Sequence, residues 1–152
     1  MRLKNKIDSA RVQTAIEAAE AKSSGEIVVS VAELYLGNIH AAAQHAFERL
    51  GVANTQLRNG VLLFIAPARR RFEIVADEGA RDKVTPGFWD VVAGRLSQRF
   101  AAHEYTAGLV EAIETIGDEL AVRFPRCAGD INELPDAPAP YCDLTASLLP
   151  RR

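Results

Sequence analysis

The sequence predicts an α/β fold, a three-layer α/β/α sandwich built on a small mixed β-sheet. Helical and strand-like patterns alternate along residues 1–125 in the order α-β-α-β-β-α-α. A strand, a helix and a second strand follow one another between residues 26 and 66, which predicts a parallel βαβ crossover. A short loop at 67–70 leads into a third strand, which predicts an antiparallel hairpin.

The composition is that of one globular domain. The chain has 152 residues, 25% of them charged, and a formal net charge of −2. This charge balance lacks the basic excess typical of proteins that bind nucleic acid or anionic membranes. No apolar run is long enough to span a membrane, and residues 1–6 do not begin a signal sequence. We therefore expect a cytoplasmic protein with no nucleic-acid partner and no membrane insertion.

The first elements are a helix, a strand and a second helix. A polar pair at 8–9 can cap a helix that runs to about residue 22. The β-branched run at 26–32 predicts a central strand. A second helix opens at Gly37-Asn38 and ends at Gly51.

The stretch from residue 57 to residue 79 is the centre of the predicted sheet. The unbroken apolar run at 61–66 is typical of a strand buried on both faces. The run that follows alternates, with Phe72, Ile74 and Ala76 on one face, as in a half-buried strand.

Two further helices complete the domain. Thr85-Pro86 is a typical helix start, and apolar residues follow at a helical spacing through Phe100. The apolar positions from Tyr105 to Leu120 predict the longest helix, which Pro125 closes.

Beyond residue 125 the pattern changes. Five of the seven prolines lie in residues 125–152, and no apolar period is visible there. We therefore expect a domain at 1–125 and a Pro-rich C-terminal tail at 126–152. Cys127 and Cys142 lie in this tail without the spacing of a zinc site, so free thiols are expected.

Polar side chains from three strands should meet at one edge of the sheet. Glu26 opens the first strand, Asn59 and Gly60 open the second, and Asp77 closes the third. Parallel strands begin at the same edge, and an antiparallel neighbour ends there. Arg58 and Glu78 adjoin these positions in the chain and share the predicted edge.

Two interpretations of this cluster stay open. In the first, its oxygens bind Ca²⁺ or Mg²⁺, with Asp77 and Glu26 as ligands and Asp82 or Asp90 completing the shell. Arg58 would then hold an anion such as a phosphate through its planar fork. In the second, the residues are ordinary polar groups at strand ends, and Arg58 pairs with Asp77.

The hairpin tip carries three successive arginines, Arg69, Arg70 and Arg71. It lies at the edge of the sheet opposite to the acidic cluster. A charged tip usually serves solubility, although it could also dock an acidic partner.

Several short motifs are characteristic of one family. They are Ser23-Ser24-Gly25-Glu26 within residues 18–29, Arg58-Asn59-Gly60 within 55–66, residues 72–79, Phe88-Trp89, Gly108-Leu109, Phe124-Pro125 and Asn132-Glu133-Leu134. Together they resemble the TPM domain, found in bacterial proteins and in a plant thylakoid-lumen protein. The match spans residues 8–135, and its Thr-x-x-Arg-Asn-Gly pattern resembles the bacterial single-domain branch.

The resemblance implies a mixed sheet between helices and the binding of a divalent cation, calcium included. For the plant branch it implies acid phosphatase activity and photosystem repair. Residue by residue it extends first to Asp77 and then to Glu26 and Asn59. This chain reads Asp77-Glu78-Gly79 where many members read Gly-x-Gly, and many members are membrane-anchored or exported.

The expected function combines both arguments. A divalent cation, Ca²⁺ or Mg²⁺, held by Asp77, Glu26 and Asp82 would activate a water and polarise a phosphate ester. The catalytic set would be completed by the other polar residues of this edge: Arg58 and Asn59, with Glu78 as general base. The alternative is a non-enzymatic, metal-stabilised module that docks a protein partner, as in assembly or repair of membrane protein complexes.

Overall fold

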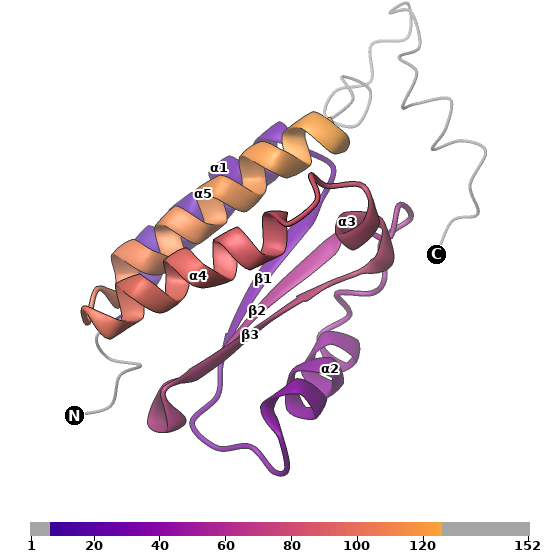
Figure 1. Ribbon diagram of the computed structural model, residues 1–152. Helices are drawn as coiled ribbons and strands as arrows, with labels where there is room; N and C mark the ends of the chain where they lie inside the picture. The colour runs from indigo at the N-terminus through magenta and orange to yellow at the C-terminus, as the bar shows by residue number, and fades with distance from the viewer. Residues whose placement is uncertain (1–6, 126–152) are drawn as a thin grey trace, which may run out of the picture.

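The computed structural model describes residues 7–125 of the 152-residue chain, so the predicted tail with Cys127 and Cys142 lies outside the described residues. The sheet has three strands in the order β1-β2-β3, with bounds Glu26–Val31, Gly60–Ala66 and Arg71–Ala76. Strand β1 is parallel to β2, and β3 is antiparallel to it (Figure 1). The mixed sheet with a parallel crossover and an antiparallel hairpin is thus confirmed.

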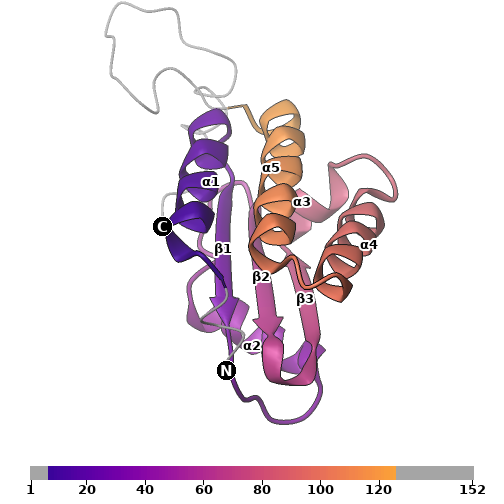
Figure 2. The same ribbon diagram turned by 90° about the vertical axis from the view of Figure 1, so that its left-hand side faces the viewer.

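Helices cover both faces of this sheet. One face carries α1, α4 and α5, with bounds Ser9–Lys22, Phe88–Ala101 and Tyr105–Arg123 (Figures 1 and 2). The other face carries α2, Ile39–Arg49, and the short helix α3, Glu78–Asp82, follows β3. The three-layer arrangement predicted from the sequence is confirmed. Among the described residues, no helix is both long and apolar enough to cross a membrane.

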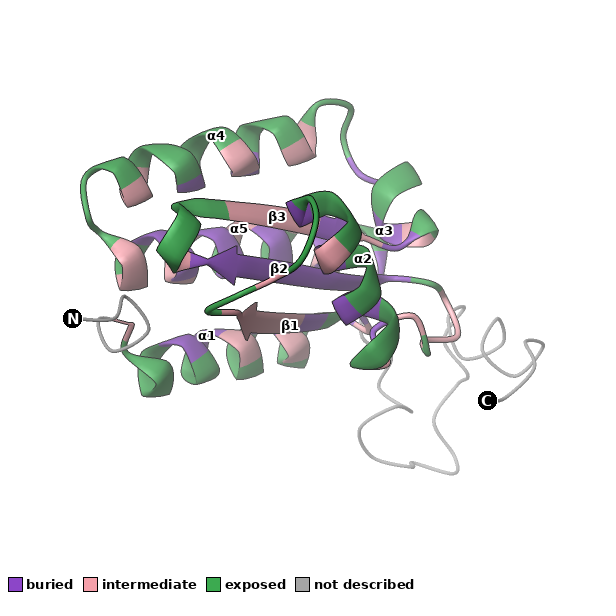
Figure 3. Cartoon of the chain, turned by 90° about the horizontal axis from the view of Figure 1, so that it is seen from below, coloured by how far each residue is buried: buried purple, intermediate pink, exposed green. Residues whose placement is uncertain are grey.

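Strand β2 is buried along all seven of its residues (Figure 3). Alternate side chains of a strand point to opposite faces, so a strand between two helical layers must be apolar at every position. Val61, Leu63 and Ile65 belong to the core cluster that also contains buried residues of α1, α4 and α5. Leu62 and Phe64 belong to the cluster on the α2 side.

Strand β1 lies at an edge of the sheet, so the prediction of a central strand is wrong. Within the described residues it pairs with β2 alone, and Ile27 is its one buried residue. The valines of β1 are partly buried and pack against the two core clusters. β-Branched side chains are favoured in any strand that packs against helices, whether it lies at the edge or in the centre of a sheet. The composition of residues 26–31 therefore does not distinguish an edge strand from a central one.

Helix α4 begins at Phe88 rather than at the predicted Thr85-Pro86. Gly87, with φ of 81°, occupies the N-cap position. The backbone N–H and the hydroxyl of Thr85 both donate to Glu119 of α5, at 2.9 and 3.1 Å. The oxygen of this hydroxyl accepts from Arg123 Nη2 of α5 at 3.1 Å, so it is engaged by α5 and does not cap α4.

Candidate functional site at the sheet edge

The three strand ends meet as chain direction requires. Glu26 is paired with Gly60 across β1 and β2, and the N–H of Asp77 donates to the carbonyl of Gly60 at 2.9 Å. Asn59 directly precedes Gly60. Glu26, Asn59 and Asp77 therefore lie at one end of the sheet, although Glu26 and Asp77 are separated by most of the βαβ crossover and the hairpin.

Asp77 and Arg58 form a bidentate ion pair at this edge. Arg58 Nε donates to Asp77 Oδ2 at 2.8 Å, and its Nη2 donates to Oδ1 at 2.9 Å. The Asp77 side chain is 6% exposed and that of Arg58 is 45% exposed. The hydrogen bonds to Asp77, and then its charge, raise the pKa of the Arg58 guanidinium. This bidentate pairing is the one expected by the second interpretation of the cluster.

Asp77 also caps helix α3. Its Oδ1 accepts a hydrogen bond from the N–H of Glu78 at 2.8 Å. The helix consequently starts at Glu78, directly after its capping residue. With the two bonds from Arg58, the carboxylate accepts three hydrogen bonds from its own chain.

The backbone around Arg58 is held by close contact with α3. Arg58 adopts a left-handed conformation with φ of 53°. Its carbonyl accepts from the N–H groups of Gly79 and Ala80, at 2.8 and 3.2 Å. A Cβ atom at Gly79 would lie 2.4 Å from the Leu57 carbonyl oxygen, so only glycine permits this approach. A left-handed non-glycine residue costs roughly 1–2 kcal/mol, and such strain often occurs at functional sites.

Asn59 is 1% exposed and only partly satisfied. Its N–H donates to Thr55 Oγ1 at 3.0 Å, and its Nδ2 donates to Ser24 Oγ at 3.3 Å. The Oδ1 atom is buried without a hydrogen-bond partner in the described structure. A buried acceptor without a partner gives up its hydrogen bonds to water and gains none in the protein, which typically destabilises the folded state by about 1–3 kcal/mol. Asn59 Oδ1 therefore carries a desolvation cost that no hydrogen bond among the described residues offsets.

The remaining predicted residues surround this core less closely. Burial, and then the charge of Glu20, raises the pKa of Glu26. The Asp82 side chain is 69% exposed and accepts from Arg81 Nε at 3.4 Å. Glu78 contributes its N–H to the Asp77 cap, and its side chain is exposed. Between residues 7 and 125, no three acidic, histidine or cysteine side chains form a group able to hold a metal. Asp77, Glu26 and Asp82 are thus not assembled as one set of ligands.

Sequence reasoning missed the residues that support Asn59. Thr55 and Ser24 accept hydrogen bonds from the N–H and the Nδ2 of Asn59. Both stand in the motifs that carry the family resemblance, and Thr55 is the first residue of the Thr-x-x-Arg-Asn-Gly pattern. The presence of Thr55 in this pattern was the one hint in the sequence that it supports the site. Its role and that of Ser24 follow from the fold, which places the loop before β2 beside the segment that leads into β1.

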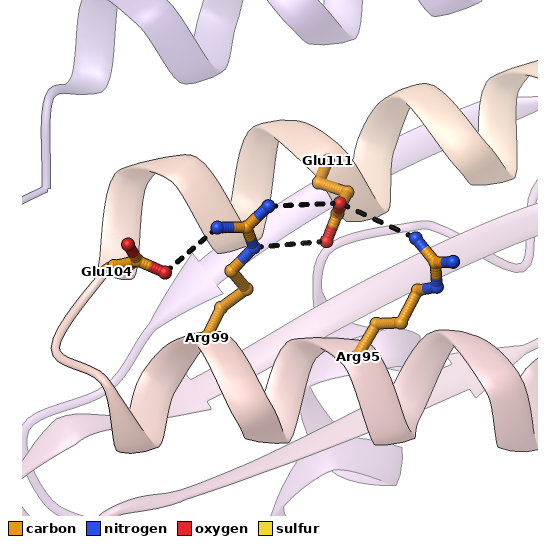
Figure 4. Close-up of polar contacts among 4 residues, drawn as sticks. All are labelled: Arg95, Arg99, Glu104 and Glu111. Atoms are coloured by element: carbon orange, nitrogen blue, oxygen red, sulfur yellow. Dashed lines mark hydrogen bonds and ion pairs between the residues drawn. The ribbon is translucent and has the colours of Figure 1, made fainter.

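A second polar cluster, also not predicted, joins α4 to α5 (Figure 4). Arg99 donates to both carboxylate oxygens of Glu111 at 3.4 Å and to Glu104 at 2.9 Å. Arg95 lies 3.6 Å from Glu111. The hydrogen bonds from Arg99 lower the pKa of Glu111. The helices approach closely here, because a Cβ at Gly108 would lie 2.8 Å from Arg99 Cβ. The cluster therefore fastens one helix to the other.

Three solved structures share this architecture. The BA42 protein from the psychrophilic bacterium Bizionia argentinensis has a TM-score of 0.75 and 34% identity, covering 85% of this chain and 91% of that one. The N-terminal domain of the cg2496 protein from Corynebacterium glutamicum has a TM-score of 0.59 and 18% identity, with 75% and 74% covered. The N-terminal domain of a P. gingivalis protein has a TM-score of 0.63 and 18% identity, with 78% of each chain covered. The latter two show likeness of fold alone.

Family comparison agrees with the resemblance seen in the motifs. Comparison with curated proteins gives no match. The model of the TPM domain matches residues 5–119, which include the sheet, the helices through most of α5, and the whole Asp77 edge. This chain belongs to the TPM domain family.

Proposed function

We propose that this TPM domain binds a divalent cation at the sheet edge, with Asp77 as the principal ligand. The observation that carries the proposal is the unequal burial of the Arg58–Asp77 pair. A carboxylate that is 6% exposed is neutralised by a guanidinium that is 45% exposed. A buried anion keeps a counter-charge, and the exposed partner is the one that can leave and be solvated.

The donor atoms suit a hard cation. Asp77 offers carboxylate oxygens, Asn59 Oδ1 is a buried oxygen without a partner, and Glu26 opens the neighbouring strand. Mg²⁺ is usually held by one or two carboxylates and keeps several waters, whereas Ca²⁺ takes six to eight oxygens. With Asp77 and Glu26 as the two carboxylates at this edge, the proposed site fits the ligand number of Mg²⁺ better than that of Ca²⁺.

A second candidate function, hydrolysis of a phosphomonoester, is favoured by the same pair. When Asp77 exchanges Arg58 for a cation, the Arg58 fork becomes available for phosphate oxygens. A bound cation supplies Lewis acidity and lowers the pKa of water. Arg58 would then orient the anion beside Asn59, and Glu78, at the first position of α3, would accept a proton.

Thermal melting in the presence of Mg²⁺, Ca²⁺ or Mn²⁺ tests the cation site. A cation at 100 times its dissociation constant stabilises the native state by about 2.7 kcal/mol, which raises the melting temperature by several degrees. We expect Asp77→Asn to abolish this increase. Asp118→Asn, which removes an exposed partner of Lys22, should leave the increase intact.

Arg58→Gln is a second test variant. It keeps Asp77, so it remains informative even if the Asp77→Asn protein does not fold. It leaves Asp77 without its counter-charge, so the variant should melt lower without cation and show a larger cation-induced increase than wild type. An unchanged melting temperature of wild type with all three cations contradicts the proposal. An increase of equal size in Asp77→Asn would also contradict it.

Turnover of p-nitrophenyl phosphate separates the two functions. If the domain is a phosphatase, cation-dependent turnover should disappear in Asp77→Asn and fall in Arg58→Gln, while Asp118→Asn retains it. Cation binding without turnover would instead assign the domain to a cation-stabilised module for a protein partner.

A further inference from the structure

A cavity of about 430 Å³ lies at the other end of the sheet from Asp77. The β2–β3 hairpin, the end of α4 and the connection between α4 and α5 line this partly open cavity, together with Ile7. Its volume is within the range of sites that hold small organic molecules. None of the residues discussed at the Asp77 edge lines it.

The wall of the cavity is apolar and aromatic. Ile65, from the central strand, is 2% exposed. The rings of Phe72 and Phe100 meet edge to face with centroids 5.7 Å apart, and Phe100 meets Tyr105 in the same way at 5.4 Å. Three linked rings from β3, α4 and α5 thus give the cavity a stiff apolar side, suited to an aliphatic or aromatic group.

The charges that line the cavity are all of one sign. Arg70 and Arg71 contribute to its lining, together with His103, and no carboxylate does. Neither arginine forms an ion pair with another residue between Ile7 and Pro125. By contrast, Arg99 nearby is occupied by Glu104 and Glu111. Arg70 ends the 3-10 turn Pro67–Arg69 in a left-handed conformation with φ of 55°, so a defined turn presents these two guanidinium groups.

We propose that this cavity binds a small amphiphilic anion. The apolar part of the ligand lies against Ile65, Phe72 and Phe100, and its carboxylate or phosphate group accepts hydrogen bonds from Arg70 and Arg71. The charge of the lining selects the anion over a neutral or cationic molecule of the same shape. Residues 1–6, which precede the lining residue Ile7, contain three basic side chains and no acidic one, so they do not complement this lining.

Calorimetric titration of the full chain with three ligands of equal tail length tests the charge preference. The ligands are decanoate, decanol and decyltrimethylammonium, each below the concentration at which it forms micelles. We expect decanoate to bind with one site per chain and about tenfold more tightly than decanol, since charge-assisted hydrogen bonds are worth about 1.5–3 kcal/mol. Decyltrimethylammonium should bind more weakly than either. Equal binding of all three, or no binding of decanoate, overturns the proposal.

Two arginines of the same hairpin provide a matched pair of variants. Arg71→Gln should weaken decanoate binding about tenfold because it removes a charged donor from the cavity. Arg69→Gln should leave the affinity nearly unchanged, because Arg69 stacks over the Tyr35 ring at 4.6 Å and does not line the cavity. An equal loss in both variants would indicate only the general charge of the tip and would overturn the proposal.

A cavity-filling variant tests whether the ligand is inside. Ala101 lines the cavity and is exposed, so Ala101→Phe should block decanoate binding without a large change in melting temperature.

Vesicles of phosphatidylglycerol test whether the protein binds a lipid bilayer or a free amphiphile. If such vesicles bind wild type and Ala101→Phe equally while decanoate binds neither, the anion is held at the surface and the cavity proposal is overturned.

Discussion

Asp77 and Gly79 show how few atoms hold the candidate site in place. The Asp77 carboxylate accepts from Arg58 and from the first N–H of α3. Two residues later, Gly79 allows the Leu57 and Arg58 carbonyls to approach the helix. The loop before β2 and the start of α3 are therefore held together in two ways. The Asp77 carboxylate binds both segments, and Gly79, which has no side chain, lets their backbones come into contact.

Two glycine-to-alanine substitutions should have opposite effects on stability. Gly79→Ala places a Cβ 2.4 Å from a carbonyl oxygen of the backbone, so it should lower the free energy of unfolding by about 1–3 kcal/mol. Gly94→Ala, in the exposed middle of α4, meets nothing within 4 Å and should raise it by about 0.5–1 kcal/mol. Urea denaturation of both variants checks this. A Gly79→Ala variant as stable as Gly94→Ala would show that the loop relaxes freely.

Helix α5 is fixed to its neighbours by carboxylates. Glu111 is bound by Arg99 of α4, and Glu119 accepts from both donors of Thr85, in the segment that leads into α4. Both pKa values lie below the ordinary 4.5, that of Glu111 chiefly because of the Arg99 hydrogen bonds and that of Glu119 chiefly because of the Thr85 N–H. The ionised forms of these groups therefore favour the folded state.

These two carboxylates should make the domain sensitive to acid. A folded-state pKa below 4.5 means that the stabilisation is complete above pH 4.5 and is lost as the pH falls through the folded pKa. We expect Glu111→Gln and Glu119→Gln to be less stable than wild type at pH 7 and to lose less stability than wild type below pH 4.5. The check is the free energy of unfolding measured by urea denaturation between about pH 3 and pH 7, a range that includes the ordinary carboxyl pKa.

Glu114→Gln is the control for this experiment. Glu114 lies on the same helix, is exposed, and has no ion pair with the described residues. It should follow the wild-type curve. If the Glu111 and Glu119 variants also followed that curve, the hydrogen bonds to these carboxylates would contribute nothing to stability.

Across the whole molecule, β2 is shared by both cores. Its side chains alternate between the layer of α1, α4 and α5 and the layer of α2. Neither layer can lose this strand without exposing the other, so the described domain should unfold as one cooperative unit.

Leu62→Ala and Leu63→Ala test this cooperativity. Both leucines have no exposed surface but belong to opposite cores, and each substitution should cost about 2–5 kcal/mol. Trp89, the one tryptophan of the chain, reports on the α4 side. Its fluorescence and far-ultraviolet circular dichroism should give the same midpoint in urea for both variants. A fluorescence transition that remains at the wild-type position in Leu62→Ala would mean that the α2 layer unfolds separately.

The local patterns were sufficient for the architecture and for the meeting of the strand ends. The unbroken apolar run at 61–66 indicated a strand covered on both faces. The directions of the three strands then brought Glu26, Asn59 and Asp77 to one edge. Such properties follow from the spacing of residues along the chain, because the periods of helix and strand are local.

The sequence left two interpretations open for Asp77, one of them the pair with Arg58, and the tertiary structure decided between them. Thr85 has the chemistry of a helix cap but donates to Glu119, and the carboxylate of Asp77 is already taken by Arg58 and by α3. The arginines of the hairpin tip were visible in the sequence, whereas the aromatic cavity beneath them needed Phe72, Phe100 and Tyr105 from three elements. A hydrogen bond or a cavity depends on distances of a few ångströms between segments that are remote in the chain. The spacing of residues along the sequence does not determine those distances.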